Sequence, residues 1–248
     1  MYHPTLDEIK NTKWDGNLIP VYREIVADME TPVSAFLKIN RGGNSFLLES
    51  VEGGQRLARY SFIGTEPYHE LIINGKDKTD PLDIIAEELH KYQAVPLAGL
   101  PRFAGGAVGY LSYETVNRFE NLPSPAKDPL NLPEARFMFV DTMLVFDHVT
   151  HKIKVLSHIK LNGDLEKEYQ KAVSKIDDLI SRLQQPYSVK KAAPGKVGPK
   201  SASKLTSNTS RKAFEANVQK IKEYITAGEA IQVVYSQRLS RPTDLPPF

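Results

Sequence analysis

Residues 46–64 read FLLESVEGGQRLARYSFIG, and this stretch is the key to the rest of the chain. An apolar run at 46–48 ends at Glu49 and Ser50, a polar segment with two glycines follows, and apolar residues return at Tyr60, Phe62 and Ile63. This pattern predicts a strand, a turn, a short helix or loop, and a second strand. A carboxylate and a hydroxyl at a strand end could hold a small ligand that carries an amine. They could equally cap the turn, because turns are rich in such side chains.

The flanking residues predict a mixture of helices and strands. Helices are expected at 20–29, where apolar residues recur four apart, at 81–92 with Asp80 as its cap, and at 164–183, where the 3.6-residue period is clearest. Strands are expected at 34–39 (followed by a hairpin turn at 40–44), 71–73, 136–148 and 152–160.

The glycine-rich run at 103–111 does not match a phosphate-binding loop. It lacks the GxGxxG spacing, and no GKS or GKT follows it. We therefore predict a buried strand whose glycines allow two backbones to approach closely.

Residues 186–208 interrupt the apolar periodicity. The segment is rich in proline, glycine, serine and lysine, and no acidic residue occurs between Asp178 and Glu215. Because it has no aromatic residue except Tyr187, we predict a flexible basic linker rather than a nucleic-acid-binding segment. A helix that ends at Gly228 is expected to begin after Thr209 or Ser210, either of which could cap it, and a buried strand is expected at 231–239.

The composition is that of an ordinary globular protein. The 248 residues are 41% hydrophobic and 25% charged, and the net charge of +2 argues against a nucleic-acid partner. The absence of cysteine excludes disulfides and thiolate chemistry, and no apolar run is long enough for a membrane helix. His148 and His151 flank a predicted hairpin turn without a third ligand nearby, so no metal site is predicted there. These features favour a cytoplasmic protein with no membrane partner.

Several short motifs resemble one known family. LLES at 47–50 and RYSFIG at 59–64 are similar to the N-terminal signature of anthranilate synthase component I. Residues 20–25, 31–36, 105–110 and 232–238 also resemble segments of that family, and all of them occur in the family's order.

The resemblance implies an α+β fold and a division of the chain. We expect an antiparallel β-sandwich-like unit with flanking helices, which forms a regulatory N-terminal domain over 1–185. After the linker at 186–208, residues 209–248 would be the first helix and strand of a truncated chorismate-binding catalytic domain. Members of the family are roughly twice as long, so we expect this chain to be a fragment.

The family converts chorismate and ammonia into anthranilate and pyruvate. The resemblance implies Mg²⁺ as cofactor, a glutamine amidotransferase subunit (component II) as ammonia source, and tryptophan as feedback inhibitor. The family's metal ligands and acid–base residues lie in the C-terminal half, so none is assigned here and the chain alone is predicted to be inactive. The alternatives are aminodeoxychorismate synthase component I and a non-catalytic module that senses tryptophan or docks a glutaminase.

Four residues are assigned through the resemblance. Glu49 would pair with the ammonium of tryptophan, Ser50 would hydrogen-bond to it, and Arg59 lies near a position where the family often has a basic residue. Relatives that add water carry a Lys where this chain has Gln232, so Gln232 would face the substrate of an ammonia-using enzyme. Alternatively, Gln232 is only a polar residue at the start of a strand.

Overall fold

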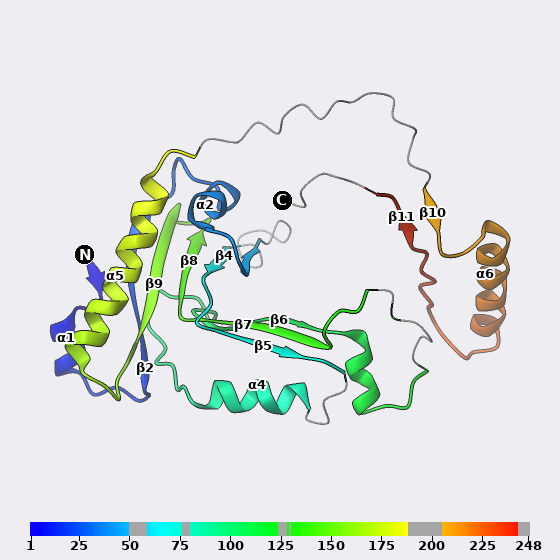
Figure 1. Ribbon diagram of the computed structural model, residues 1–248, viewed down its shortest axis with the longest axis horizontal. Coiled ribbons are helices and arrows are strands. Elements are labelled where there is room, and N and C mark those ends of the chain that lie inside the picture. Colours follow the sequence, from blue (N-terminus) through cyan, green and yellow to red (C-terminus); the bar gives the residue numbers. More distant parts are fainter. Residues whose placement is uncertain (50–58, 76–79, 124–127, 129, 188–204, 243–248) are drawn as a thin grey trace. The chain divides into compact units, whose positions relative to one another are not determined.

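The computed structural model describes residues 1–49, 59–75, 80–123, 128, 130–187 and 205–242, which form parts of two compact units. The units are Met1–Ser188 and Val189–Phe248. In order along the first unit, the elements are β1 (Tyr2–His3), α1 (Leu6–Asn11), β2 (Leu18–Val26), α2 (Pro32–Ile39), β3 (Ser45–Leu48), β4 (Tyr60–Thr65), β5 (His69–Ile73), α4 (Pro81–His90), β6 (Gly106–Leu111), η1 (Tyr113–Arg118), β7 (Ala135–Val140), β8 (Thr142–Asp147), β9 (Lys152–Lys160) and α5 (Leu165–Gln184) (Figure 1). The second unit contains β10 (Thr206–Ser207), α6 (Arg211–Thr226) and β11 (Leu239–Ser240).

The first unit is built on a six-stranded sheet with the strand order β1-β2-β9-β8-β4-β3. Every pair of neighbouring strands in it is antiparallel. β8 and β9 form a central hairpin, and β2 pairs with β9 along its whole length, from Leu18↔Lys160 to Val26↔Lys152. β3 therefore lies at one edge of the sheet, with β4 as its neighbour.

Alternation along the central strands gives the sheet two apolar faces. On β8, Leu144 and Phe146 belong to one hydrophobic cluster, whereas Met143 and Val145 belong to another. The first cluster also contains the buried side of α5, and Figure 1 shows α5 running beside β9. A strand that is apolar on both faces must be covered on both, since successive side chains point to opposite faces.

The second cluster contains residues of a smaller sheet with the order β5-β7-β6. Both of its pairs are antiparallel, and α4 runs along this sheet in Figure 1. Val140 ends β7 and Thr142 begins β8, so Asp141 is the single residue at which the chain passes from the small sheet to the large one. The prediction of one continuous strand over 136–148 is therefore wrong.

Two neighbouring predictions are wrong: the predicted helix at 20–29 is mainly a strand, and the predicted strand at 34–39 is a helix. The segment at 20–29 lies mainly in β2, and 34–39 lies in α2. A spacing of four residues is an even number, so Val21 and Ile25 share a face of a strand as readily as a face of a helix. In α2 the buried residues Pro32, Ala35, Phe36 and Ile39 follow the helical period.

Thr31 is the cap of α2, a helix start signal that the strand prediction for 34–39 did not take into account. Its hydroxyl accepts from the Ser34 N–H, the Ser34 hydroxyl accepts in return, and Pro32 occupies the first turn. Because 40–44 connects α2 to β3, the predicted hairpin turn there is also wrong.

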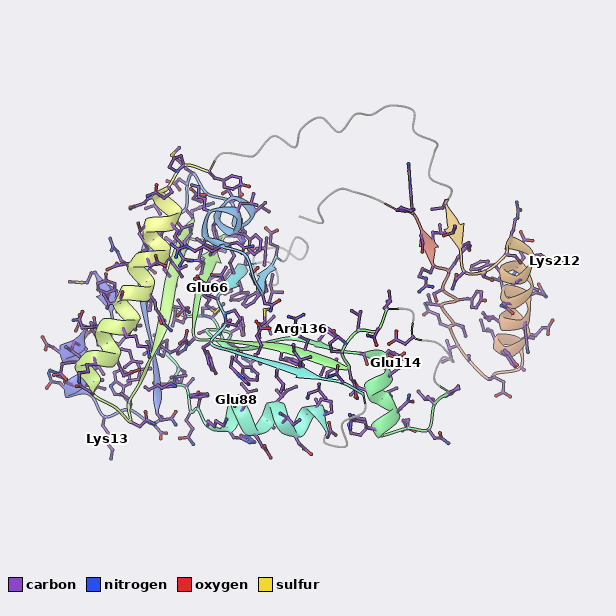
Figure 2. The ribbon with its side chains drawn as sticks, in the orientation of Figure 1. Lys13, Glu66, Glu88, Glu114, Arg136 and Lys212 are labelled. Atoms are coloured by element: carbon purple, nitrogen blue, oxygen red, sulfur yellow. The ribbon has the colours of Figure 1, made fainter. Side chains whose placement is uncertain are left out.

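Most of the other predictions for the described part of the first unit hold. Strands β3, β4, β5 and β9 form where apolar runs were found, and helices α4 and α5 begin after Asp80 and Asp164, whose carboxylates accept from backbone N–H groups. The turn and the short helix or loop predicted between β3 and β4 lie outside the described residues. An exception is β6, which is strand as predicted but half-exposed to exposed, since it lies at a sheet edge. Near the end of α5, Arg182 donates to Glu66, which is labelled in Figure 2, at 2.7 Å and to the Ile39 carbonyl at 3.1 Å.

In the second unit, α6 begins after Ser210 as predicted, and Gly228 follows its end with a φ of +82°. The buried strand predicted at 231–239 is wrong for the described residues. Only Leu239 and Ser240 pair, with Ser207 and Thr206, and Ile231 is 99% exposed. Apolar and β-branched residues favour a strand only where a neighbouring strand covers and pairs with them.

The architecture is therefore a mixture of helices and antiparallel sheets, as predicted, while the sandwich-like arrangement stays a prediction. The predicted linker lies mostly outside the described residues, and the domain boundaries at 185 and 209 also stay predictions. Among the described helices, none combines the length and apolar character required to cross a membrane.

Candidate functional site

Glu49 lies directly after β3 and its side chain is exposed. The register Ser45↔Thr65 to Leu48↔Phe62, continued by one residue, places Glu49 opposite Ser61, two residues from Arg59. Glu49 and Arg59 therefore lie at the same end of the β3–β4 pair. Ser50 is outside the described residues, so its part in the predicted site stays a prediction.

Arg59 forms a two-point ion pair with Asp147, the last residue of β8. Its Nε and Nη2 donate to the two carboxylate oxygens at 3.1 and 2.7 Å. The Asp147 side chain is 2% exposed, and it also accepts from the backbone N–H groups of Val149 and Thr150. Burial alone would raise the pKa of Asp147, but the hydrogen bonds from Arg59 and these N–H groups outweigh burial and hold it at about 2.

This ion pair gives Arg59 a structural role without using the whole guanidinium. Two of its three nitrogens bind Asp147, and the Arg59 side chain remains 41% exposed. The guanidinium carbon also lies 4.9 Å from the centre of the Tyr60 ring. A ligand carboxylate could still approach the third nitrogen, so the predicted regulatory contact of Arg59 stays a prediction.

Asp147 gives a prediction for acid stability. Its folded pKa lies below the value of about 3.9 expected in an unfolded chain, so its contribution is complete above about pH 4 and is lost as the pH falls towards 2. We expect Asp147→Asn to lower the free energy of unfolding by about 1–2 kcal/mol at pH 7. The difference between the two proteins should shrink steadily between about pH 4 and pH 2 in urea titrations. An equal difference at pH 7 and pH 2.5 would contradict this account of the ion pair.

Gln232 lies in the second unit, in a segment without regular structure, and its side chain is exposed. The segment is held to α6 by Tyr235, whose ring lies 5.1 Å from that of Phe214 and whose hydroxyl accepts from Asn217 at 2.6 Å. The substrate-facing role of Gln232 stays a prediction.

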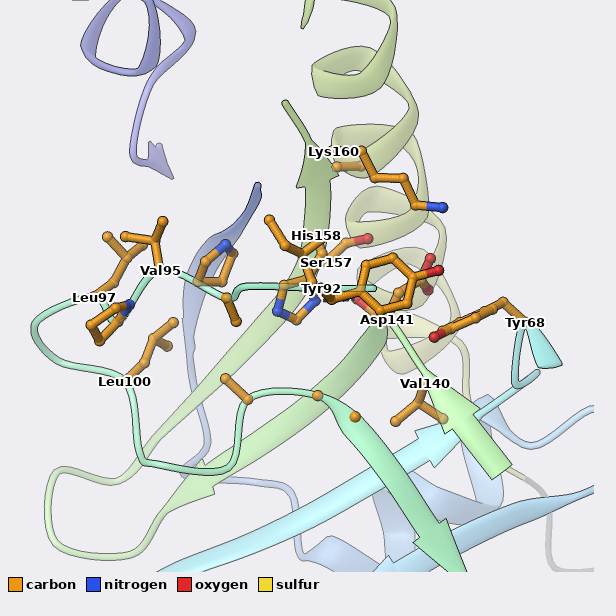
Figure 3. A pocket seen from close by; sticks show the side chains of 18 of the residues that line it. Tyr68, Tyr92, Val95, Leu97, Leu100, Val140, Asp141, Ser157, His158 and Lys160 are labelled. Atoms are coloured by element: carbon orange, nitrogen blue, oxygen red, sulfur yellow. Dashed lines mark hydrogen bonds between the residues drawn. The ribbon is translucent and has the colours of Figure 1, made fainter. Parts of the chain in front are cut away.

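The first unit also contains a cavity of about 740 Å³ that the sequence did not indicate. Its wall comes from β2, the end of α4, the segment at 94–106, Asp141, the end of β9 and one side of α5. Figure 3 shows Tyr92, His158 and Asp141 at its centre, with Leu97 and Leu100 on one side and Tyr68 on the other. The volume lies within the usual range of pockets for small molecules.

Asp141 and His158 form the polar centre of this cavity. The His158 ring nitrogen Nδ1 lies 2.9 Å from the Asp141 carbonyl oxygen, which can only accept, so Nδ1 carries the hydrogen. Burial lowers the pKa of His158, which keeps the ring neutral near pH 7. Burial alone would raise the pKa of the Asp141 carboxyl, but its ion pair with Lys175, at 2.7 Å, outweighs that effect and lowers it.

No local sequence pattern predicts this cavity, because its lining comes from separate segments. No motif contains both Asp141 and His158, and they meet because β8 and β9 form a hairpin whose open end lies beside Asp141. Among the described residues, no group of three acidic or histidine side chains could hold a metal ion.

Comparison with known proteins identifies the class to which this fold and sequence belong. Residues 43–248 match the family described as chorismate binding enzyme. The chain therefore belongs to the chorismate-binding enzyme family.

Within that family, the chain is similar to anthranilate synthase component 1. It is 41% identical to that protein of Acetivibrio thermocellus over 265 residues, with 100% of this chain and 53% of the relative covered. It is 41% identical to the probable anthranilate synthase component 1 of Schizosaccharomyces pombe over 252 residues, covering 99% of this chain and 50% of the relative. The resemblance found in the motifs is thus confirmed, and the chain spans about half the length of these curated relatives.

A solved structure shows the same likeness in three dimensions. Anthranilate synthase component I from Streptococcus pneumoniae TIGR4 matches with a TM-score of 0.58 and 25% sequence identity. The match covers 90% of this chain and 50% of that chain.

Proposed function

We propose that this chain is the N-terminal portion of an anthranilate synthase component I. The whole enzyme would convert chorismate and ammonia into anthranilate and pyruvate, with ammonia supplied by a partner glutamine amidotransferase. Tryptophan would inhibit it by binding near Glu49, Ser50 and Arg59. The observation that carries the proposal is the 41% identity to an anthranilate synthase component 1 over the full length of this chain.

The relatives' names favour this proposal over aminodeoxychorismate synthase. Of the two curated relatives compared above, one is named anthranilate synthase component 1 and the other probable anthranilate synthase component 1, and the similar solved structure carries the corresponding title. A non-catalytic sensing or docking module remains an outcome that the activity assay below distinguishes.

Magnesium enters the proposal only as a cofactor of the whole enzyme. The described residues offer no cluster of three acidic or histidine ligands, so they do not fit a Mg²⁺ site and no catalytic step through the metal is derived for them. The proposal places the metal ligands and the acid–base groups outside the described residues.

Anthranilate fluorescence tests the proposed reaction. We expect the protein extended to the length of its relatives to form anthranilate from chorismate, ammonia and Mg²⁺, and the 248-residue chain alone to form none. Formation of aminodeoxychorismate by the extended protein would assign it to the alternative enzyme. No consumption of chorismate by the folded, extended protein would favour the non-catalytic module.

Glu49 and Ser50 give a prediction for inhibition. In the extended protein, Glu49→Gln and Ser50→Ala should each weaken tryptophan inhibition roughly ten- to hundredfold, because a hydrogen bond to a charged group is lost. Turnover without tryptophan should be nearly unchanged, since Glu49 is exposed at the edge of the first unit's sheet. Inhibition curves over a range of tryptophan concentrations give the measurement.

Glu24→Gln serves as the matched control for Glu49→Gln, because Glu24 is a carboxylate on β2, far from β3 in the strand order, where it pairs with Lys152 and Lys154. Its inhibition curve should match that of the wild type. Unchanged inhibition in both the Glu49 and Ser50 variants would reject the regulatory site while leaving the proposed reaction intact.

A further inference from the structure

The cavity of the first unit has an apolar wall that the fold does not cover. Leu89, at the end of α4, lines it and is 39% exposed, and the partly exposed Leu97 and Leu100 lie on the segment that follows. Pro81 is the only buried residue of α4. An apolar group entering the cavity would therefore remove these side chains from water, which is favourable.

The same cavity carries an excess of positive charge. Four basic side chains line it, those of Arg102, Lys160, Lys171 and Lys175. Asp141 and Glu168 are the two acidic ones, and neutral His158 does not change the balance. Such a lining favours an anion.

The acidic side chains are already used by two of the lysines. Asp141 binds Lys175 at 2.7 Å, and Glu168 lies 3.8 Å from Lys171. Within the described residues, Lys160 has no carboxylate partner, and its ammonium lies 5.3 Å from the centre of the Tyr92 ring. Lys160 is thus a cation placed directly beside an aromatic surface, with its charge available to a ligand.

We propose that this cavity binds a small cyclic carboxylate, whose carboxylate pairs with Lys160 and whose ring packs against Tyr92 and the leucine wall. The excess of cations favours an anion, and the aromatic ring of Tyr92 together with the apolar side chains of Leu89 and Leu97 favours a ring. Neither Glu49 nor Arg59 lines the cavity. The site is therefore distinct from the proposed tryptophan site, and the inference does not rest on the proposed function.

Benzoate, benzamide and acetate test the two halves of this proposal with the 248-residue chain. Benzoate carries both the ring and the charge, benzamide has the same shape without the charge, and acetate has the charge without the ring. We expect benzoate to bind saturably with a dissociation constant of about 1 mM or lower in ligand-observed NMR titrations. The other two should bind at least about tenfold more weakly.

Variants locate the binding. Lys160→Met keeps most of the length of the side chain and removes its charge, and it should weaken benzoate binding roughly five- to tenfold, since the lysine is solvent-exposed. Tyr92→Leu should weaken it by a similar factor through loss of the ring. Lys13→Met is the control, because Lys13 is exposed and does not line the cavity, and it should bind as the wild type does.

Four outcomes would overturn the proposal, and the first three concern benzoate binding itself. They are the absence of saturable benzoate binding, equal binding of benzamide and benzoate, and unchanged binding by a folded Lys160→Met variant. A loss of binding in Glu49→Gln instead of Lys160→Met would also overturn it, because the ligand would then occupy the sheet edge.

Discussion

Gly109→Ala is expected to destabilise the first unit by about 3 kcal/mol or more, although it adds only one methyl group. Gly109 lies on β6 and pairs with Phe137 of β7. A Cβ atom at this position would lie 2.0 Å from the Arg136 carbonyl oxygen and 2.7 Å from the Phe137 Cα. Because both are backbone atoms, no side-chain rotation can relieve the clash, and the strands must separate.

Thermal unfolding followed by circular dichroism measures the effect. A loss of 3 kcal/mol corresponds to a fall of about 6–12 °C in Tm for a domain of this size. Gly163→Ala is the matched control, because its added Cβ would meet only the Cγ of Glu168, at an ordinary contact distance of 3.7 Å. Equal Tm values for the two variants would contradict the close approach of β6 and β7.

The close approach at Gly109 is an example of what could be predicted from the sequence. The glycines at 105–109 lack the spacing of a phosphate loop, and a strand with a close backbone neighbour was the remaining physical explanation. Helix α5 was equally predictable, since its buried residues Tyr169, Ala172, Ile176 and Leu183 follow one face over about four turns and Asp164 caps its start. A long apolar period and a capping residue are local signals, so a helix that has both can be predicted without knowledge of the fold.

Short apolar runs carried no such information. Residues 20–29 and 34–39 are both too short for the period to separate helix from strand, and both were assigned to the wrong class. Residues 20–26 are a strand because β2 pairs with β9 along nine residues. Residues 34–39 are a helix because the helical face of α2 is buried in the core cluster beside the sheet. These are tertiary effects that override local preference.

The candidate sites divide in the same way. Glu49 was placed at a strand end from the sequence, and the structure agrees, because an apolar run followed by a turn is a local pattern. The Arg59–Asp147 pair joins residues 88 positions apart and could not be predicted. The cavity depends on contacts between even more segments. Asp141 must connect the small sheet to the large one, and α4 must leave all its residues except Pro81 at least partly exposed.

Phe139→Ala is expected to cost about 3–5 kcal/mol, which would lower the Tm by about 6–20 °C. Phe139 is fully buried in the middle strand of the small sheet, opposite His69 on one side and Ala107 on the other. Its ring lies 5.4 Å from that of His69 and 6.4 Å from that of Tyr68. Truncation removes these contacts and leaves a void, because paired strands on both sides cannot close around the missing ring.

Ile72→Ala on β5 separates this effect from a general weakness of the sheet. Ile72 is also a large apolar residue of the small sheet, paired with Arg136, but it is 48% exposed, so its truncation should cost about 1 kcal/mol or less. Phe139→Leu should fall between the two, because it fills part of the void. If Phe139→Ala and Ile72→Ala proved equally mild in urea titrations, the small sheet would not be packed as described. Tyr68 contacts Phe139 and lines the cavity, so the position of this part of the cavity wall would then also be wrong.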